Sequence, residues 1–232
     1  MIEFNGVGLE SICPVKIDDI EVSPIRMNAT ARQRPVRWGA DFVRMTGGSR
    51  TVTITFALLT MDANMRRRQL NHITAWARSD QPQKLTLPTF PGVYLECICT
   101  ELPVPSMRQW FQDKMRIVFT TFDNPYWTDI AEKSAPCGTA IYVDGTAEPL
   151  MRIERTLASA ASNQAYANGS ETMSFTTIPK GSLVIDLNKQ TAAVGNTSIM
   201  QYYTFGSAFL LPRAGLQTIT GTGTVKWRER WD

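Results

Sequence analysis

Catalysis by a Ser-His-Asp or Cys-His arrangement would have to use the single histidine of this 232-residue chain, His72. No GxSxG motif accompanies His72, and no acidic residue is spaced to orient its ring. The residue lies in a segment with helical periodicity, near the edge of the apolar arc. We therefore expect a half-buried helix residue here and no catalytic base.

The four cysteines, at positions 13, 97, 99 and 137, could in principle bind a metal or form a redox pair. Cys97 and Cys99 lie two residues apart, so both point to one face if their segment is a strand. A disulfide between such close neighbours would be strained, and a zinc site usually shows wider paired spacing and more histidine. We expect small buried apolar side chains, with a metal or redox pair as the alternative.

Other motifs that carry chemistry are not found. The acidic cluster Asp18, Asp19 and Glu21 lies in a segment that reads as a surface turn. The stretch "TGGSR" lacks the lysine and the spacing of a phosphate-binding loop, and neither an HExxH helix nor an EF-hand loop occurs. We predict that the chain is not an enzyme and that it uses no cofactor and no metal.

Composition agrees with an ordinary globular protein of one large or two small domains, with 43% hydrophobic and 19% charged residues. A formal net charge of +3 provides no strong attraction to nucleic acid or to an anionic membrane. The chain lacks a signal-peptide pattern and any apolar run of about 18 residues. We expect no specific nucleic-acid binding, no membrane insertion and synthesis in a cytoplasm.

Residues 62–79 form the clearest predicted helix. Asp62 is a suitable N-cap, and Asp80-Gln81-Pro82 provides a stop. At 100° per residue one arc of this helix contains the apolar side chains Met65, Leu70, Ile73, Trp76 and Ala77.

The rest of the chain predicts short strands separated by turn signals, which is typical of antiparallel sandwiches and barrels. Residues 50–59 alternate, with Val52, Ile54, Phe56 and Leu58 on one face. Residues 157–172 are small and polar and favour a long loop. The predicted fold is mainly β: an N-terminal β-sandwich or barrel-like domain with one helix, residues 1–129, and a C-terminal β-sandwich, residues 130–232.

The stretch "FDNPYW" marks the predicted domain junction. Asn124 before a proline favours extended backbone, and Pro125 cannot donate to a central strand ladder, so the preceding strand should end here. We predict that Pro125, Tyr126 and Trp127 form an apolar contact between the domains.

Six arginines and one aspartate lie within residues 26–50, with Trp38 and Phe42 between them. A solvated loop, a protein interface and a nucleic-acid contact all remain open, in decreasing order of preference. The interface candidates are Arg32, Arg34, Arg37, Trp38 and Arg50. A further hypothesis is a sugar-stacking platform, for which Trp38, Trp110 and Trp127 are the candidates.

The order of segments resembles the N-terminal domain of siphophage distal tail proteins. The strand "VTITFALL" is followed by the helix "MRRRQLNHITAWARS", the hairpin "QKLTLPTFPGVYLECICTEL" and the strand "MRIVFTTFDNPYWTD". The matching positions are Lys84-Leu85, Pro91-Gly92-Val93-Tyr94 and Phe122-Asp123-Asn124-Pro125-Tyr126-Trp127. In the second half, "GSLVIDLNKQTAAVG" and "FLLPRAGLQTITGTGTVKWRERW" are similar to the family's galectin-like β-sandwich.

This resemblance implies a structural tail protein in the virion, assembled in the bacterial host cytoplasm. Residues 1–129 would form a hexameric ring at the distal end of the tail tube, and residues 130–232 a galectin-like domain that projects outward. The implied partners are other copies of the chain, the tail tube protein, and tail-tip hub or receptor-binding proteins.

The family's "GR.G" motif is matched only loosely by "RWGADFVRMTGGSR", and the second half lacks the long arm or sugar-binding module of some members. The alternative is a galectin-like carbohydrate-binding protein without catalytic activity.

Overall fold

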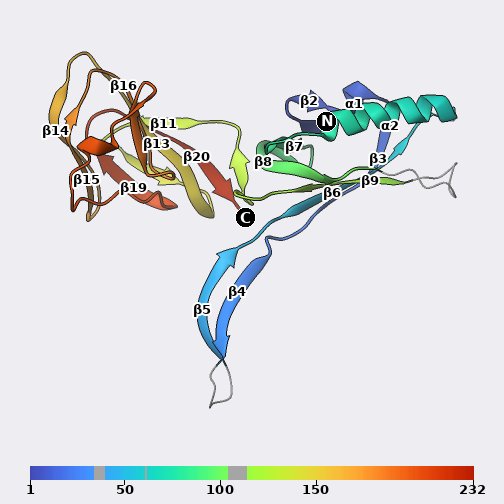
Figure 1. The fold of residues 1–232 in the computed structure, drawn as a ribbon, viewed down its shortest axis with the longest axis horizontal. Coiled ribbons are helices and arrows are strands. Elements are labelled where there is room, and N and C mark those ends of the chain that lie inside the picture. Colours follow the sequence, from blue (N-terminus) through green and yellow to red (C-terminus); the bar gives the residue numbers. More distant parts are fainter. Residues whose placement is uncertain (34–39, 61, 104–113) are drawn as a thin grey trace. The chain divides into compact units, whose positions relative to one another are not determined.

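Antiparallel strands dominate the computed structural model, which describes residues 1–33, 40–60, 62–103 and 114–232, with 27–33 and 40–47 defined by backbone alone (Figure 1). This architecture confirms the predicted mainly-β fold class. The chain divides into unit 1, residues 1–127 with Asp232, and unit 2, residues 128–231. The change of unit falls between Trp127 and Thr128, within the short strand β10 (Trp127–Asp129).

Unit 1 is built on a run of antiparallel neighbours in the order β3-β6-β9-β8-β7-β1-β2. Its helices are α1 (Leu9–Ile12) and α2 (Ala63–Ala77). Its strands are β1 (Glu3–Phe4), β2 (Val7–Gly8), β3 (Val15–Val22), β4 (Met27–Gln33), β5 (Ala40–Gly47), β6 (Thr51–Leu58), β7 (Gln83–Leu87), β8 (Phe90–Glu101) and β9 (Met115–Thr120).

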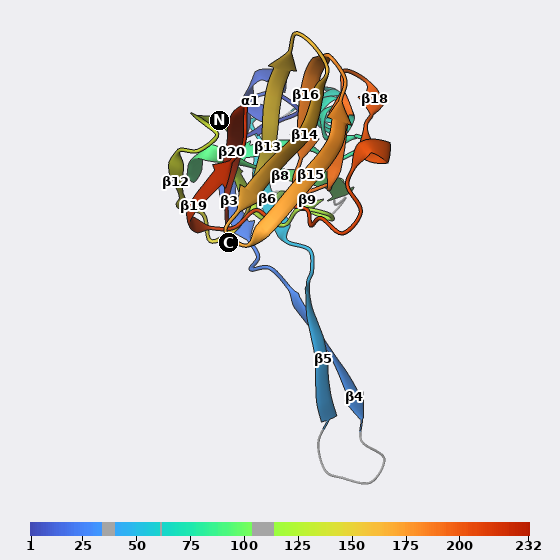
Figure 2. The same ribbon diagram turned by 90° about the vertical axis from the view of Figure 1, so that its left-hand side faces the viewer.

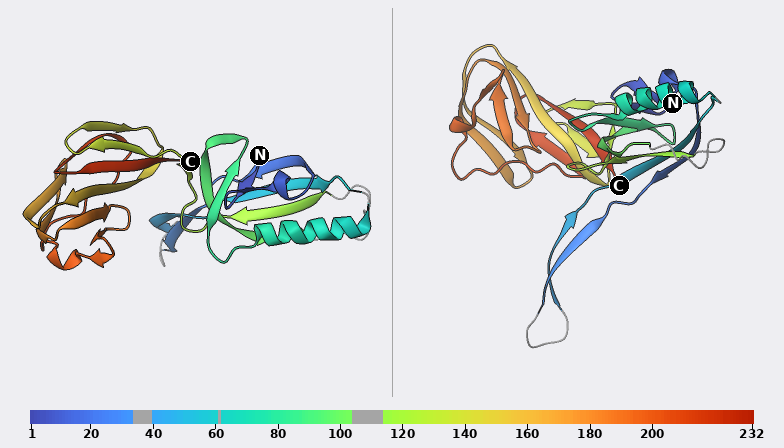
Figure 3. Two further views of the ribbon diagram at one scale, coloured as in Figure 1. Left: turned by 90° about the horizontal axis from the view of Figure 1, so that it is seen from above. Right: turned by 45° about the vertical axis from the view of Figure 1, so that its right-hand side comes forward.

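Helix α2 begins as predicted, because the Asp62 carboxylate accepts a hydrogen bond from the Asn64 backbone N–H at 3.0 Å. The helix lies along the unit 1 strands (Figure 3) and buries Ile73 and Ala77 completely. Met65 was expected on the same face but is exposed, and Arg66 is buried instead. Ile73 and Ala77 define the centre of the buried stripe. Arg66 lies seven residues before Ile73, which is about two helical turns, so Arg66 and not Met65 falls on this stripe.

His72 of α2 is exposed and not half-buried as its place near the edge of the apolar arc predicts. The buried stripe of the helix runs through Ile73, one residue further on, so the His72 ring points away from the strands.

Three aromatic rings connect α2 to the strands of unit 1. Phe4 of β1 lies 4.9 Å from Phe119 of β9, and Trp76 of α2 lies 5.8 Å from Phe4 and 6.0 Å from Phe119, all between ring centroids. The Trp76 indole N–H donates to the Val7 carbonyl at 2.8 Å. Strand β6 alternates as predicted and buries Val52, Ile54, Phe56 and Leu58 on this core side.

The acidic cluster Asp18, Asp19 and Glu21 was expected in a surface turn but lies in strand β3. This strand pairs with β6 along Val15–Val22, with a bulge between Ile17 and Asp19. Among the described strands β3 pairs only with β6 and is therefore an edge strand, where charged side chains are tolerated on the solvent side. A cluster of acidic residues in the sequence is compatible with either an edge strand or a surface turn, so the sequence alone did not distinguish the two.

Unit 2 is a sandwich of two antiparallel sheets (Figure 2). One sheet has the order β18-β17-β16-β13-β20, with β11 beside β20, and the other has the order β12-β19-β14-β15. A short 3-10 helix, η1 (Met200–Tyr202), follows β18. The strands are β11 (Lys133–Pro136), β12 (Ala140–Val143), β13 (Ala147–Leu157), β14 (Ala161–Asn168), β15 (Glu171–Ile178), β16 (Gly181–Asp186), β17 (Thr191–Val194), β18 (Thr197–Ser198), β19 (Gly215–Thr220) and β20 (Thr224–Trp231).

Both sheets of unit 2 contribute to one apolar core. Ile153, Leu183 and Ile185 from the first sheet are fully buried, and so are Met173 and Phe175 from the second. The alternation along each strand sends one set of side chains into this core and the other set to the outer face of its sheet.

Strand β14 lies within residues 157–172, so the long loop predicted for this stretch is wrong. Tyr166 is buried opposite Met173, and its hydroxyl donates to the Thr222 carbonyl at 3.2 Å. Gly169, at φ +61°, helps form the tight turn into β15. One large side chain among alanines and polar residues produced too weak an alternation to identify the strand.

Replacing Phe119 by Ala should lower the free energy of unfolding of unit 1 by about 3–5 kcal/mol, because a fully buried ring leaves a cavity between α2 and the sheet. The matched control is Phe122→Ala, which removes an exposed ring three residues further on and should change stability by less than about 0.5 kcal/mol. Urea unfolding measures both. Equal losses in the two variants would contradict this description of the core.

Candidate functional site

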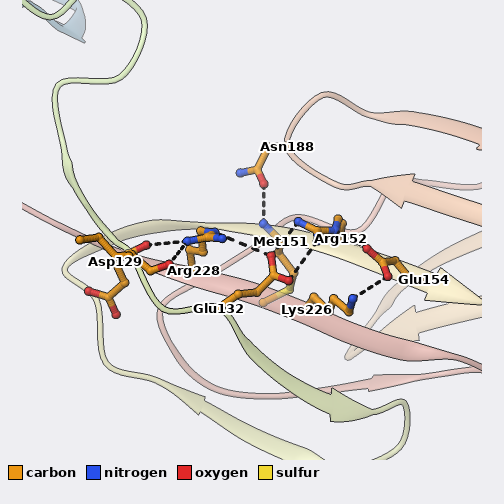
Figure 4. A network of polar contacts seen from close by, with 9 residues as sticks. Asp129, Glu132, Met151, Arg152, Glu154, Asn188, Lys226 and Arg228 are labelled. Carbon is orange, nitrogen blue, oxygen red and sulfur yellow. Dashed lines mark hydrogen bonds and ion pairs between the residues drawn. The ribbon is translucent and has the colours of Figure 1, made fainter. Parts of the chain in front are cut away.

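A row of alternating charges lies across β13 and β20 on the outer face of the first unit 2 sheet (Figure 4). The Arg152 guanidinium lies 2.8 Å from a Glu132 oxygen and donates to Glu154 at 2.6 Å, and the Lys226 ammonium lies 2.7 Å from the other Glu154 oxygen. Arg152 and Lys226 are direct cross-strand partners. Hydrogen bonds from Lys226 and then from Arg152 hold the pKa of Glu154 below its ordinary value.

Arg228 extends this row toward the start of unit 2. Its guanidinium donates to the carbonyls of Asp129 and Ile130, and its Nε lies 3.7 Å from a Glu132 oxygen. Asn188 accepts a hydrogen bond from the Met151 backbone N–H at 2.7 Å (Figure 4). These contacts hold the segment before β11 and the turn after β16 against the central strands. Their role is therefore structural.

A polar pocket of about 650 Å³ lies beside the charged row, at the ends of β13, β16 and β20. The Arg155 guanidinium at its wall donates to the Gln164 side-chain carbonyl at 2.6 Å. Hydroxyls and charges of this kind can hydrogen-bond a sugar, but no aromatic ring for stacking is among the lining residues. The pocket is lined by Glu154, Arg155, Thr156, Ser182, Thr222, Gly223, Thr224 and Lys226.

Glu229 is a buried carboxylate on the core side of β20, where the sequence pattern shows only an interruption between Trp227 and Trp231. One of its oxygens lies 2.7 Å from the Lys133 ammonium and accepts from the Asp144 backbone N–H at 3.2 Å. The hydrogen bond to Glu229 raises the pKa of Lys133. Both contacts are intramolecular, and they tie β11 and the β12–β13 connection to β20.

Arg50 and Trp127, two of the predicted site residues, lie together inside unit 1. The Arg50 guanidinium carbon is 5.9 Å from the Trp127 ring centroid, and the Phe90 ring is 4.6 Å from the same centroid. Arg50 is 5% exposed and Trp127 is 4% exposed. Burial lowers the pKa of Arg50. Trp127 therefore has no open ring face for stacking a sugar, and the stacking hypothesis is wrong for this residue.

Pro125 is buried and Tyr126 is half-buried at the end of unit 1. The Asn124 side-chain oxygen accepts from the Tyr126 backbone N–H at 3.3 Å, which forms a turn after the strand. The Arg50 backbone is held by Thr121, whose N–H donates to the Arg50 carbonyl at 2.9 Å. A contact of Pro125, Tyr126 and Trp127 with unit 2 remains a prediction. The role predicted for Arg50, a contact between neighbouring copies of the chain, also remains a prediction.

The remaining interface candidates lie on or next to the β4–β5 hairpin. Arg32 belongs to β4, opposite Asp41 of β5, whereas Arg34, Arg37 and Trp38 lie outside the described residues, as does Trp110. Strands β4 and β5 form a two-stranded sheet of their own and pair with no other described strand (Figures 1 and 2). Their role in an interface therefore stays a prediction.

The four cysteines are free thiols. Cys97 is buried and Cys99 half-buried in β8; burial raises the pKa of Cys97 well above its usual range and that of Cys99 to about 11. Such thiols are poor nucleophiles, in agreement with the small apolar role expected for them. In the described part of the chain, no cluster of three His, Cys, Asp or Glu side chains is placed to hold a metal ion. None of the described helices is long and apolar enough to cross a membrane.

The chain is similar in structure to the Dit protein (gp 19.1) of phage SPP1, described as a paradigm of the hub adsorption apparatus in phages that infect Gram-positive bacteria. The match has a TM-score of 0.79 at 11% identity and covers 99% of this chain and 98% of the SPP1 protein. A chain of the phage P2 baseplate in its activated, calcium-bound conformation matches with a TM-score of 0.43 at 8% identity, over 94% of this chain and 90% of the baseplate chain. No protein-family model and no curated protein matches the sequence.

Nearly the whole chain thus has the fold of a phage distal tail protein, which confirms, at the level of fold, the resemblance seen in the sequence.

Replacing Trp127 by Ala should lower the free energy of unfolding by about 3–5 kcal/mol, because the buried indole packs on Phe90 and under the Arg50 guanidinium. Trp127→Phe keeps part of this packing and should cost less. Thermal unfolding measures both variants. An unchanged midpoint in Trp127→Ala would contradict the packing, and unchanged protease cleavage within residues 124–137 would count against a contact with unit 2.

The Glu154 contacts predict a stability change at acidic pH. Because the pKa of Glu154 is lowered in the folded state, its contribution is present above the ordinary value of 4.5 and is lost as pH falls through the folded value. Glu154→Gln should therefore cost about 1 kcal/mol at pH 7 and less at pH 3. Urea unfolding at both pH values gives the difference, and Lys226→Met should show the same trend. A gap that stays constant between pH 7 and pH 3 would exclude this linkage.

Proposed function

We propose that this chain is a structural tail protein of a phage or prophage, which forms a hexameric ring at the distal end of the tail tube and connects the tube to the tail-tip or adsorption apparatus. The supporting observation is the likeness to the SPP1 hub protein, which extends over both units and 99% of the chain. A likeness confined to one unit would support only a shared sandwich, since such folds serve many functions.

The β4–β5 hairpin supports assembly with other copies. An isolated two-stranded sheet is marginally stable in water, and each of its outer edges presents unpaired backbone groups. Strands β4 and β5 pair with no other described strand, so a neighbouring copy that covers them would stabilise the hairpin.

Complementary charge is also available within unit 1. A ring requires two different surfaces on each copy, because the contact repeats head to tail. By its sequence, the segment of residues 26–44, with five arginines and one aspartate, is our candidate for one such surface. The exposed acids of β3 (Asp18, Asp19 and Glu21) are the candidate for the other. Asp18 already attracts two lysines of its own chain, Lys16 and Lys114, each at 3.8 Å.

In this role the chain is not an enzyme. Its partners are the other ring copies, the tail tube protein, and the tail-tip hub or receptor-binding proteins, and its place is the virion tail after assembly in the bacterial host cytoplasm. Unit 2 corresponds to the galectin-like domain that would project from the ring.

A carbohydrate-binding protein is the alternative, and the polar pocket beside Glu154, Arg155 and Lys226 favours it. A glycan array distinguishes the two functions. Binding that disappears in Arg155→Ala would support the alternative, and an array without binding would count against it.

Six copies of the 26.0-kDa chain would have a mass of about 156 kDa, which light scattering of the purified protein measures. The ring should weaken when Asp19→Lys and Glu21→Lys are combined, and Glu148→Lys in unit 2 is the control. Antibodies against the chain should label the distal ends of tails in electron micrographs. Particles labelled elsewhere, or not at all, would refute the proposed function.

A further inference from the structure

Helix α2 forms an outer layer of unit 1 and presents a basic face to solvent (Figures 1 and 3). The buried side chains of the helix are Arg66, Ile73 and Ala77, so the side opposite to them is fixed outward. Three of the residues on that outward side are arginines, and none is acidic. This side, here the arginine face, consists of the exposed residues Arg67, Arg68, Asn71, His72, Ala75 and Arg78.

Nothing within α2 balances the charge of the arginine face. An exposed helix usually places an acidic residue three or four positions from a basic one. Residues 63–79 contain neither aspartate nor glutamate. The acids at the two ends are Asp62, which accepts the N-cap hydrogen bond from Asn64, and Asp80, which follows the helix.

The surroundings of α2 leave the arginine face unbalanced as well. Among the residues that the structure describes, no carboxylate lies within ion-pair distance of Arg67, Arg68 or Arg78. By contrast, the exposed Arg116 of β9 is paired with Glu101 of β8 at 2.5 Å. Like charges gathered without a counter-charge repel one another, and an acidic partner relieves this repulsion.

The core beneath α2 holds the arginine face in place. Trp76 packs on Phe4 of β1 at 5.8 Å and donates its indole N–H to the Val7 carbonyl at 2.8 Å. At 1.5 Å per residue, Arg67 and Arg78 lie about 16 Å apart along the helix axis. A partner therefore meets a pre-ordered row of guanidinium groups, and binding does not have to order the backbone that carries them.

Two anionic surfaces other than protein fit the arginine face poorly. A bilayer requires apolar side chains beside the basic ones, but the apolar side of α2 packs on the strands, and Met65 is the one exposed large apolar side chain of residues 63–77. Duplex nucleic acid carries a charge about every 1.7 Å along its axis and is bound by a wide basic field. The formal net charge of the whole chain is only +3. Arginine, by contrast, is enriched at protein interfaces and pairs with carboxylates through two parallel hydrogen bonds.

We infer that the arginine face docks a carboxylate-bearing surface of a different protein, whose Asp or Glu side chains meet Arg67 and Arg68 at one end and Arg78 at the other. The Asn71 amide lies between these ends and can hydrogen-bond a polar group of the partner. This contact rests on the proposed function, which supplies neighbouring tail proteins and assigns the acids of β3 to the contact between copies. It goes beyond the ring by giving unit 1 a separate surface for another tail protein.

Fluorescence anisotropy with a labelled model peptide tests this charge recognition on the full-length chain. The probe is an alanine-based helical peptide with glutamate pairs about 16 Å apart, and the same peptide with glutamine in their place is the blank. Arg67→Gln combined with Arg78→Gln should weaken binding about 10-fold or more, because both ends of the face lose their charge. Arg116→Gln is the matched control, since it removes an exposed unit 1 arginine that already has an acidic partner. This control should leave binding unchanged.

Equal binding of the glutamate and glutamine peptides, or no loss in the double variant, would overturn the inference. The same holds if a short DNA duplex or phosphatidylglycerol vesicles bind more tightly than the peptide and lose their binding in the double variant. The arginine face would then serve nucleic acid or a bilayer. The thermal midpoint should not change in any of these variants, because the replaced side chains are exposed.

Photocrosslinking in assembled tails identifies the partner. p-Benzoylphenylalanine in place of Ala75, an exposed uncharged residue of the arginine face, should link to an acidic peptide of a protein other than this chain. Arg67→Glu with Arg68→Glu should abolish the link, and changing two acids of the linked peptide to Lys should restore it.

A link only to another copy of this chain, or no link in tails that contain the chain, would overturn the inference and leave the proposed function in place. If no tail contains the chain, the proposed function fails, and the peptide measurement still decides whether the arginine face binds carboxylates.

Discussion

The packing of two antiparallel sheets on one apolar core determines the direction of almost every side chain in unit 2. Because successive residues of a strand face opposite sides, burying Met173 and Phe175 commits Thr172 and Ser174 to the outer face. A shift of one residue in register would expose the core side chains, so the pairing is strongly specified. The surfaces available for contact are therefore a consequence of the core.

The same constraint separates charge between the two outer faces. On β13 and β20 the outward positions carry Arg152, Glu154 and Lys226, whose two positive charges are balanced by Glu154 and by Glu132. On the other sheet the outward positions are small, hydroxyl-bearing or apolar, and the cross-strand partners Tyr142 and Leu216 are exposed at one edge. Glu229 is a buried exception, and its bonds to Lys133 and to the Asp144 N–H make that burial tolerable. The charged face thus adds cross-strand ion pairs to the stability of unit 2.

In unit 1 the helix and the β4–β5 hairpin differ in how they are held. Its helix is fastened to the sheet by the rings of Phe4, Trp76 and Phe119, whereas its hairpin β4–β5 pairs with no other described strand. A fold shared with the SPP1 hub protein at 11% identity shows that such an arrangement depends on patterns of burial and turn residues more than on particular side chains. This explains why a resemblance in the order of segments was detectable in a sequence that matches no protein-family model.

Features that depend on neighbouring residues were determined by the sequence itself: the Asp62 cap and helix α2, the alternation of β6, and the end of strand β9 before Pro125. Those that depend on distant partners were decided only by the tertiary structure. The acids of β3 lie in a strand because β6 pairs with it, and Trp127 is buried because Phe90 and Arg50 cover it. Nothing local marks Phe205 as exposed, since its exposure results from hydrogen bonds between its turn and β15, a strand about 30 residues earlier in the chain. Propensity and periodicity act over a few residues, whereas burial and pairing depend on which distant segments meet.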